Sequence, residues 1–252
     1  MRSCFHNLFL LFLAIFLLSS CQSITRNSAD MAVPGSTVIF SFDDGPNASF
    51  DSTARLLDVL KKYEINSLFV LLGENAEAYP ELVRRIHNEG HYIVNHGYAG
   101  KWARGMGEGE FLNNLTRGEI AISSALGHEL SPKLYRPHGG FYSSRHEKIY
   151  SEAGYTMVPG SVRVYDAVKS GKDQDKVIRR VIKKIEKENG GIVLLHDSRD
   201  SHFQMNKKLE KKPDSAFNRS WIPEATEGII IALISKGYNL YGTAEYVEEM
   251  IK

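Results

Sequence analysis

Short runs of consecutive apolar residues alternate along the chain with longer stretches in which apolar residues recur every three or four positions. The short runs predict buried strands, and the spaced patterns predict amphipathic helices. Strands are expected at residues 37–40, 66–72, 92–94, 133–135, 155–158, 162–165, 191–195 and 238–240, and helices at 52–63, 80–89, 106–126, 173–188, 223–236 and 244–251. This alternation, without a repeat or an interior linker, predicts a parallel β/α fold and, within that class, a barrel.

Polar residues that can do chemistry follow the ends of four predicted strands. They are Asp43 with Asp44, His96, Arg136 and His196. In β/α barrels the active site is built at the carboxyl ends of the strands, so these residues are candidates for one site.

The neighbouring carboxylates of Asp43 and Asp44 suggest metal-assisted hydrolysis, in which one acid holds a cation and the other accepts a proton. Gly45 and Pro46 break the strand behind them. Adjacent strand residues point to opposite faces, but a turn at this place can bring both carboxylates to one pocket. Taken alone, the stretch favours a solvated turn, because such turns are common, and the other candidates reverse this preference.

Each of the other candidates has an alternative interpretation. His96 suits zinc or a similar ion beside a carboxylate, but it could be a hydrogen-bonded core residue. Arg136 could pair with a carboxylate of the pocket or be a surface charge. His196 is well placed to act as a general acid, whereas His196 and Asp197 together could form a helix cap.

The composition fits a single domain with a sizeable core. The chain has 252 residues, of which 42% are hydrophobic. The formal net charge is +1 and there is no long run of one sign. We therefore expect no nucleic-acid partner.

The N-terminus has the features of an exported lipoprotein. Arg2 precedes an apolar run at residues 8–18 that is short for a membrane span. The sequence LSSC at residues 18–21 resembles the lipobox of bacterial lipoproteins, which implies cleavage before Cys21 and acylation of that residue. The alternative is an ordinary signal peptide followed by an incidental cysteine.

We therefore expect a signal peptide at residues 1–20, a lipidated Cys21 with a flexible tether at 21–35, and one catalytic domain at 36–252. The mature protein would be a monomer, anchored by lipid to a membrane of the bacterial cell envelope and facing the periplasm or the exterior. Cleavage would remove the other cysteine, Cys4, so the domain would have no disulfide.

Five short motifs occur in a fixed order. They are SFDDGP at 41–46, PELVRRIHNEGHYIVNHG at 80–97, YRPHGG at 135–140, VYD at 164–166 and LLHD at 194–197. From residue 36 to about residue 246 the chain thereby resembles the polysaccharide deacetylases of the NodB-homology type, carbohydrate esterase family 4. The resemblance implies a distorted (β/α)7 TIM-like barrel and metal-dependent removal of N-acetyl groups from amino-sugar polysaccharides. Peptidoglycan, poly-N-acetylglucosamine and a chitin-like glycan all remain open as substrates.

The resemblance also implies roles for the residues at the first strand ends. Asp43 would be the general base, and Arg136 would orient it. Asp44 and His96 would bind a divalent metal, which we expect to be zinc, with cobalt or nickel as alternatives.

Further roles follow from the later motifs. The backbone N–H of Gly139 would help to hold the oxyanion, and Leu194 would line the acetyl pocket. His196 would be the general acid that protonates the leaving amine, with Asp166 tuning it.

The sequence departs from the family pattern at the metal site and at two aromatic positions. Gly100 stands where the family usually has a second metal-binding histidine, so His138 or His202 would have to supply a replacement. His138 and Gly139 stand in place of a proline and an aromatic residue, and Ala167 stands in place of a tryptophan.

Two other functions remain open at this stage. The first is a glycan-binding protein without catalytic activity. It would result if replacing the second metal-binding histidine by Gly100 had abolished metal binding. An enzyme of the same fold that acts on another small amide or ester is the second alternative.

Overall fold

The protein is described by a computed structural model, which covers residues 24–26, 35–199, 209 and 211–252. Seven strands form one sheet in the order β7-β5-β4-β3-β2-β9-β8, and each neighbouring pair is parallel. The strands are β2 (Val38–Asp43), β3 (Leu68–Leu71), β4 (Tyr92–Asn95), β5 (Leu134–Tyr135), β7 (Thr156–Met157), β8 (Val162–Arg163) and β9 (Gly191–His196).

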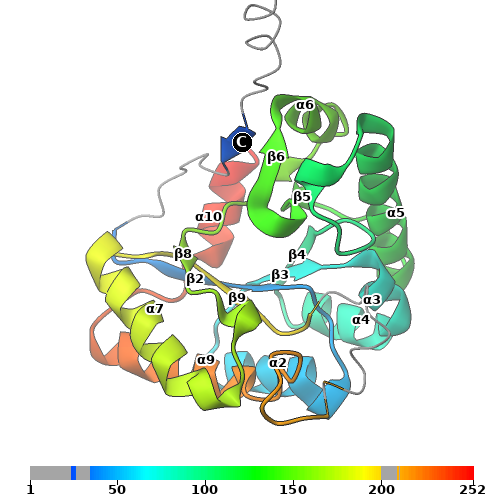
Figure 1. Ribbon diagram of the computed structural model, residues 1–252. Helices are drawn as coiled ribbons and strands as arrows, with labels where there is room; N and C mark the ends of the chain where they lie inside the picture. The colour runs from blue at the N-terminus through cyan, green and yellow to red at the C-terminus, as the bar shows by residue number, and fades with distance from the viewer. Residues whose placement is uncertain (1–23, 27–34, 200–208, 210) are drawn as a thin grey trace, which may run out of the picture.

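Helices follow most of these strands and pack around the sheet (Figure 1). They are α2 (Ser52–Lys62), α3 (Gly73–Ala78), α4 (Pro80–Asn88), α5 (Glu108–Leu126), α6 (Ser144–Glu152), α7 (Gln174–Glu188), α9 (Ile222–Ser235) and α10 (Thr243–Met250). In the described residues no pairing joins the edge strands β7 and β8, so the barrel is open on that side. The predicted distorted (β/α)7 barrel is confirmed.

The alternation of side chains along β2 decides what faces the site. Val38, Phe40 and Phe42 are fully buried in the apolar cluster that β2 forms with the outer helices, including α2 and α9. Ile39 belongs to a second cluster inside the barrel, together with residues of β3, β4 and α10. Because side chains alternate along a strand, Asp43 shares the inner face with Ile39.

Some elements differ from the sequence-based expectation. The strand expected at 238–240 is reduced to one parallel bridge between Thr37 and Asn239. Helix α6 was not expected, because its sequence SRHEKIYSE is mostly polar and offers little apolar spacing. It begins with a capping box in which His146, instead of the usual glutamate or glutamine, reaches back to the Ser143 N–H.

The segment expected to be a flexible tether contains a short strand. Residues Ile24–Arg26 form β1, which pairs antiparallel with β6 (Phe141–Ser143). Cys21 and the predicted signal peptide lie outside the described residues. In the described part of the chain, no helix has the length and apolar character that crossing a membrane requires.

Candidate active site

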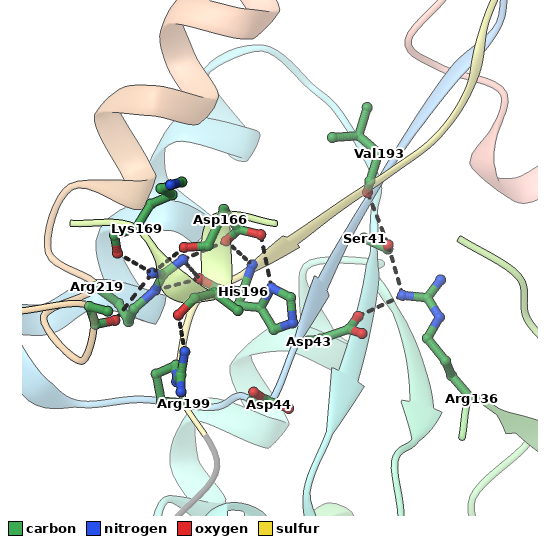
Figure 2. Close-up of polar contacts among 12 residues, drawn as sticks. Ser41, Asp43, Asp44, Arg136, Asp166, Lys169, Val193, His196, Arg199 and Arg219 are labelled. Carbon is green, nitrogen blue, oxygen red and sulfur yellow. Dashed lines mark hydrogen bonds and ion pairs between the residues drawn. The ribbon is translucent and has the colours of Figure 1, made fainter. Parts of the chain in front are cut away.

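The predicted site residues meet at the carboxyl ends of the central strands. Strands β2 and β9 are neighbours, and their register places Asp43 opposite His196. Figure 2 shows Asp43 between Arg136 on one side and the ring of His196 on the other, with Asp44 just beyond the end of β2. The structure therefore brings these residues of three separate motifs into one place.

A left-handed backbone conformation turns Asp44 into the same site as Asp43. Asp44 has φ 72°, which is uncommon for a residue other than glycine. Its carbonyl accepts a hydrogen bond of 2.7 Å from the Asn75 side chain in α3. Both carboxylates are buried, at 4% and 5% exposure, so the alternative of a solvated turn is wrong.

Arg136 fixes the orientation of Asp43. Its Nη1 donates to Asp43 Oδ1 at 2.6 Å and to Ser41 Oγ at 2.9 Å. Its Nε and Nη2 donate to the carbonyls of Val158 and Pro159. A buried guanidinium with four hydrogen bonds cannot move away from its carboxylate without leaving donors unpaired. The alternative of a surface charge is therefore wrong for Arg136.

Asp44, His96 and His138 form a cluster that can hold a metal ion. One ligand atom from each lies within 4.8 Å of the others, and all three side chains are buried. Nε2 of His96 and Nε2 of His138 are each 3.5 Å from Asp44 Oδ1. Metal–ligand bonds of about 2.1 Å place two ligands of one tetrahedral ion about 3.4 Å apart, so the spacing suits an ion such as zinc.

The tautomer and charge of His96 also suit a metal ligand. Its Nδ1 lies 2.7 Å from the carbonyl oxygen of Arg136, which accepts the Nδ1 proton and leaves the Nε2 lone pair free. Burial lowers the pKa of His96 to about 4, so the ring is neutral near pH 7. Burial alone would raise the pKa of Asp44, but the neighbouring imidazoles, His138 first, hold that pKa well below its ordinary value. The site thus presents one carboxylate and a neutral His96.

His138 supplies the histidine that Gly100 cannot. It belongs to η3 (His138–Gly140), which follows β5, whereas Gly100 lies in the loop after β4. The rings of His96 and His138 are 5.1 Å apart between centroids. Of the two replacements considered from the sequence, His138 is therefore in place, and His202 lies outside the described residues.

His196 is held by a buried carboxylate. Its Nδ1 donates to Asp166 Oδ1 at 2.9 Å, and its backbone N–H donates to Asp166 Oδ2 at 2.9 Å. Burial opposes protonation of the ring, but the charge and hydrogen bond of Asp166, together with Asp44 and Asp43, raise the pKa of His196 to about 9. The imidazole is therefore protonated at neutral pH, as a general acid must be.

Sequence reasoning missed Arg219, which lies beneath this pair. Arg219 is 1% exposed, and its Nη2 donates to Asp166 Oδ2 at 2.5 Å. It also donates to the carbonyls of His196, Asp166 and Lys169 (Figure 2). Arg219 lies in a polar stretch without periodicity, so the sequence offers no signal that distinguishes it from the other charged residues there.

Asp197 does not cap a helix, and its carboxylate instead contacts α2 and the turn after β2. Its carboxylate is buried and accepts a 2.5 Å hydrogen bond from Thr53 in α2. Burial raises the pKa of Asp197 to about 7. A side chain at Gly45 would lie 2.6 Å from Asp197 Oδ1, so the glycine allows the turn after β2 to lie against this carboxylate.

Gly139 and Leu194 also lie near the candidate residues. Gly139 directly follows His138 and has φ 78°, a left-handed conformation that glycine adopts readily. Leu194 lies on β9, paired with Ser41 of β2 and Arg163 of β8. Ala167, where the family has tryptophan, uses its carbonyl to accept a hydrogen bond from Arg199.

Comparisons with known proteins show which proteins the chain resembles. A model of the family described as polysaccharide deacetylase matches residues 30–158. A peptidoglycan-N-acetylglucosamine deacetylase of Bacillus cereus is 34% identical over 167 residues, covering 66% of this chain and 58% of that protein. The chain thus spans less than two thirds of that relative's own length.

Solved structures have the same fold. A peptidoglycan N-acetylglucosamine deacetylase in complex with 4-naphthalen-1-yl-N-oxidanyl-benzamide matches with a TM-score of 0.66 and 29% identity, over 84% of this chain and 91% of that one. A family 4 acetyl xylan esterase from Clostridium thermocellum in complex with a cobalt ion matches with a TM-score of 0.63 and 26% identity, over 81% of this chain and 86% of that one.

Proposed function

Since the chain belongs to the polysaccharide deacetylase family, we propose that it is a metal-dependent hydrolase that removes N-acetyl groups from amino-sugar polysaccharides. One observation carries the proposal. A carboxylate held by an arginine lies opposite a protonated histidine held by a carboxylate, on adjacent strands and beside a three-residue metal cluster. The peptidoglycan deacetylase relative supports an N-acetylated glycan as the substrate.

The metal would be held by Asp44, His96 and His138. When bound, a divalent ion in such a site acidifies water and polarises the amide carbonyl. We propose zinc, with cobalt or nickel as alternatives, because two imidazoles and one carboxylate suit all three ions. The cobalt ion in the related acetyl xylan esterase supports a divalent ion in general.

Asp43 would accept the proton of the attacking water. Its Oδ1 is bound to Arg136, and its Oδ2 lies 3.8 Å from Nε2 of His96. One oxygen is therefore fixed by the arginine while the other faces the metal cluster. A base in a fixed position needs no reorganisation at the moment of proton transfer.

His196 would donate a proton to the leaving amine. Asp166 occupies its Nδ1, so the proton to be transferred is the one on Nε2. We further propose that the N–H of Gly139 contributes to oxyanion binding and that Leu194 contacts the acetyl methyl group. A fixed N–H donor of this kind is worth about 3–4 kcal/mol in comparable sites.

The test is acetate release from an N-acetylglucosamine tetramer and from peptidoglycan, with zinc, cobalt or nickel supplied. Asp43→Asn and His196→Ala should each lower turnover by about 10²–10⁴-fold, because each removes one proton-transfer group. Asp58→Asn is the matched control, since its side chain is 68% exposed and pairs with Arg85 on the surface.

Wild-type turnover in Asp43→Asn would exclude the mechanism. If the wild type binds the glycan and the metal but releases no acetate, the glycan-binding alternative without catalysis replaces the enzyme. Acetate release from small esters or amides alone would favour the third alternative.

A further inference from the structure

Trp102 is an exposed tryptophan that packs on the metal-binding segment. It lies in the loop between β4 and α5, just before η2 (Ala103–Gly105), and its side chain is 62% exposed. A Cβ placed on Gly139 would be 3.0–3.2 Å from Cγ, Cδ1 and Cδ2 of the indole. These three ring atoms are almost equidistant, so the ring covers Gly139 with its face.

The absence of a side chain at Gly139 is what allows this contact. Any larger residue would meet the indole at less than the usual contact distance. Gly139 directly follows His138, so the indole stands beside the Asp44, His96 and His138 cluster without contributing a ligand. The backbone of the loop is fixed there, because the Trp102 carbonyl accepts a 2.9 Å hydrogen bond from the Gly105 N–H.

Two other exposed aromatic residues, Phe50 and Tyr165, lie at the same end of the barrel as Trp102. In the described ranges, the aromatic side chains with large exposure are Phe50, Trp102, Tyr165 and Tyr241. Phe50 follows β2 and Tyr165 follows β8, so both lie with Trp102 on loops at the carboxyl ends of strands. Tyr165 is 70% exposed and directly precedes Asp166, the partner of His196.

A ligand that covers the exposed indole would remove apolar surface from water, which is favourable. The flat face of an indole suits the C–H face of a pyranose ring, which is apolar although the ring's edge carries hydroxyl groups. An amino-sugar polymer presents such faces along its length. A tryptophan beside the metal cluster can therefore hold one sugar ring while the acetamido group of the polymer reaches the site.

We propose that Trp102 is a stacking platform for a pyranose ring of the glycan and determines specificity for a polymeric sugar. This inference rests on the proposed function, since it names a residue with which the same site holds its substrate. Trp102 takes no part in proton transfer, so its loss should weaken glycan binding without changing the chemistry.

Tryptophan fluorescence tests the contact directly, because the chain has only two tryptophans. Trp221 is 5% exposed, so only Trp102 can meet a sugar. Titration of the full chain with the N-acetylglucosamine tetramer should change the emission of the wild type in a saturable way. Trp102→Phe, which keeps Trp221, should show no change. An unchanged wild-type emission over the whole titration would overturn the inference.

Kinetics separate binding from catalysis. Trp102→Ala should raise KM for the tetramer by about tenfold, the size of one lost aromatic stack, with kcat within about twofold of the wild type. Trp102→Phe should recover part of the loss, because a smaller aromatic face remains. Tyr241→Ala is the control, since Tyr241 is 60% exposed but lies beside the Thr37–Asn239 bridge at the opposite end of the barrel.

The two proposals can fail separately. If the wild type releases acetate and Trp102→Ala keeps the wild-type KM, the platform is wrong and the proposed function stands. If the tetramer changes Trp102 emission but no acetate is released, the platform stands and the proposed function is wrong. Zinc titration of Trp102→Ala should match the wild type, and a loss of zinc binding would overturn a role limited to sugar contact.

Discussion

His138 changes the interpretation of the metal site at the scale of single residues. Gly100 has no side chain to donate, which by itself leaves Asp44 and His96 as ligands. In the structure His138 Nε2 reaches to 3.5 Å from Asp44 Oδ1, the same distance as His96 Nε2. Catalytic zinc sites usually have three protein ligands and one open position, and this cluster supplies three.

We predict that His138→Ala weakens metal binding by about 100-fold or more, because losing a direct ligand costs more than the 10–100-fold of a lost supporting contact. Gly100→His should add little, since the three donors are already present. Isothermal titration of zinc, cobalt and nickel measures both effects, with His128→Ala, an exposed histidine away from the site, as the control.

Wild-type affinity in His138→Ala would mean that His138 is not a ligand. If Gly100→His in the His138→Ala background restored binding, the loop after β4 would still be able to place a histidine at the site.

At the scale of elements, the arrangement around the general acid His196 depends on three segments that are distant in sequence. Strand β9 carries His196, the short helix η4 (Asp166–Val168) carries Asp166, and the stretch before α9 carries Arg219. Asp166 is 0% exposed and receives hydrogen bonds from both other residues. Burial alone would raise the pKa of Asp166, but the charges of His196 and Arg219 hold it below the ordinary value.

The pH profile should report this arrangement. Because the pKa of His196 is raised to about 9, kcat should fall only as the pH rises through about 9, when the acid loses its proton. Asp166→Asn removes the charge that raises this pKa, so the alkaline limb should move to lower pH. Asp214→Asn, which removes a carboxylate with a 62% exposed side chain, should leave the limb in place.

The raised pKa of His196 also makes the free energy of unfolding depend on pH. Protonated His196 stabilises the folded state because its pKa is higher there than in the unfolded chain. This contribution is fully present below the unfolded pKa of about 6.5 and is lost as the pH rises through about 9. Thermal unfolding between pH 6.5 and 9 should therefore show a loss in the wild type that is smaller in Asp166→Asn. If the alkaline limb of the kcat profile lies at the same pH in the wild type and in Asp166→Asn, the role of Asp166 is contradicted.

At the scale of the whole molecule, strand β1 lies between the predicted lipidation site and the barrel in the sequence. Strand β1 pairs with β6, and β6 directly follows η3, the segment that carries His138 (Figure 1). The predicted lipidation site, Cys21, precedes β1 by only a few residues. We propose that the protein is a lipoprotein anchored to a membrane of the cell envelope.

We predict that Cys21→Ala moves the exported protein from the membrane to the soluble fraction or leaves it unprocessed, because stable anchoring requires more than one acyl chain. Fractionation and mass spectrometry of the mature N-terminus would measure this. Cys4→Ala is the matched control, since this residue lies within the predicted signal peptide and is removed in processing. An unmodified mature N-terminus other than Cys21 would contradict the proposal.

The sequence by itself was enough to predict the β/α barrel and most of the candidate site residues. Apolar runs and helical spacing depend only on local periodicity, so they marked nearly every strand and long helix, and the polar residues after them marked Asp43, His96, Arg136 and His196. Short polar elements such as α6 were missed because they have little apolar pattern to detect.

Only the tertiary structure decided which residues meet at the site. His138 joins Asp44 across loops that follow different strands, Arg219 returns from a stretch without periodicity to bind Asp166, and Trp102 covers Gly139. None of these contacts is local. Each depends on the path of a loop, and the contact of Trp102 also depends on the missing side chain at Gly139. The spacing of residues along the chain does not encode these properties of the packed barrel.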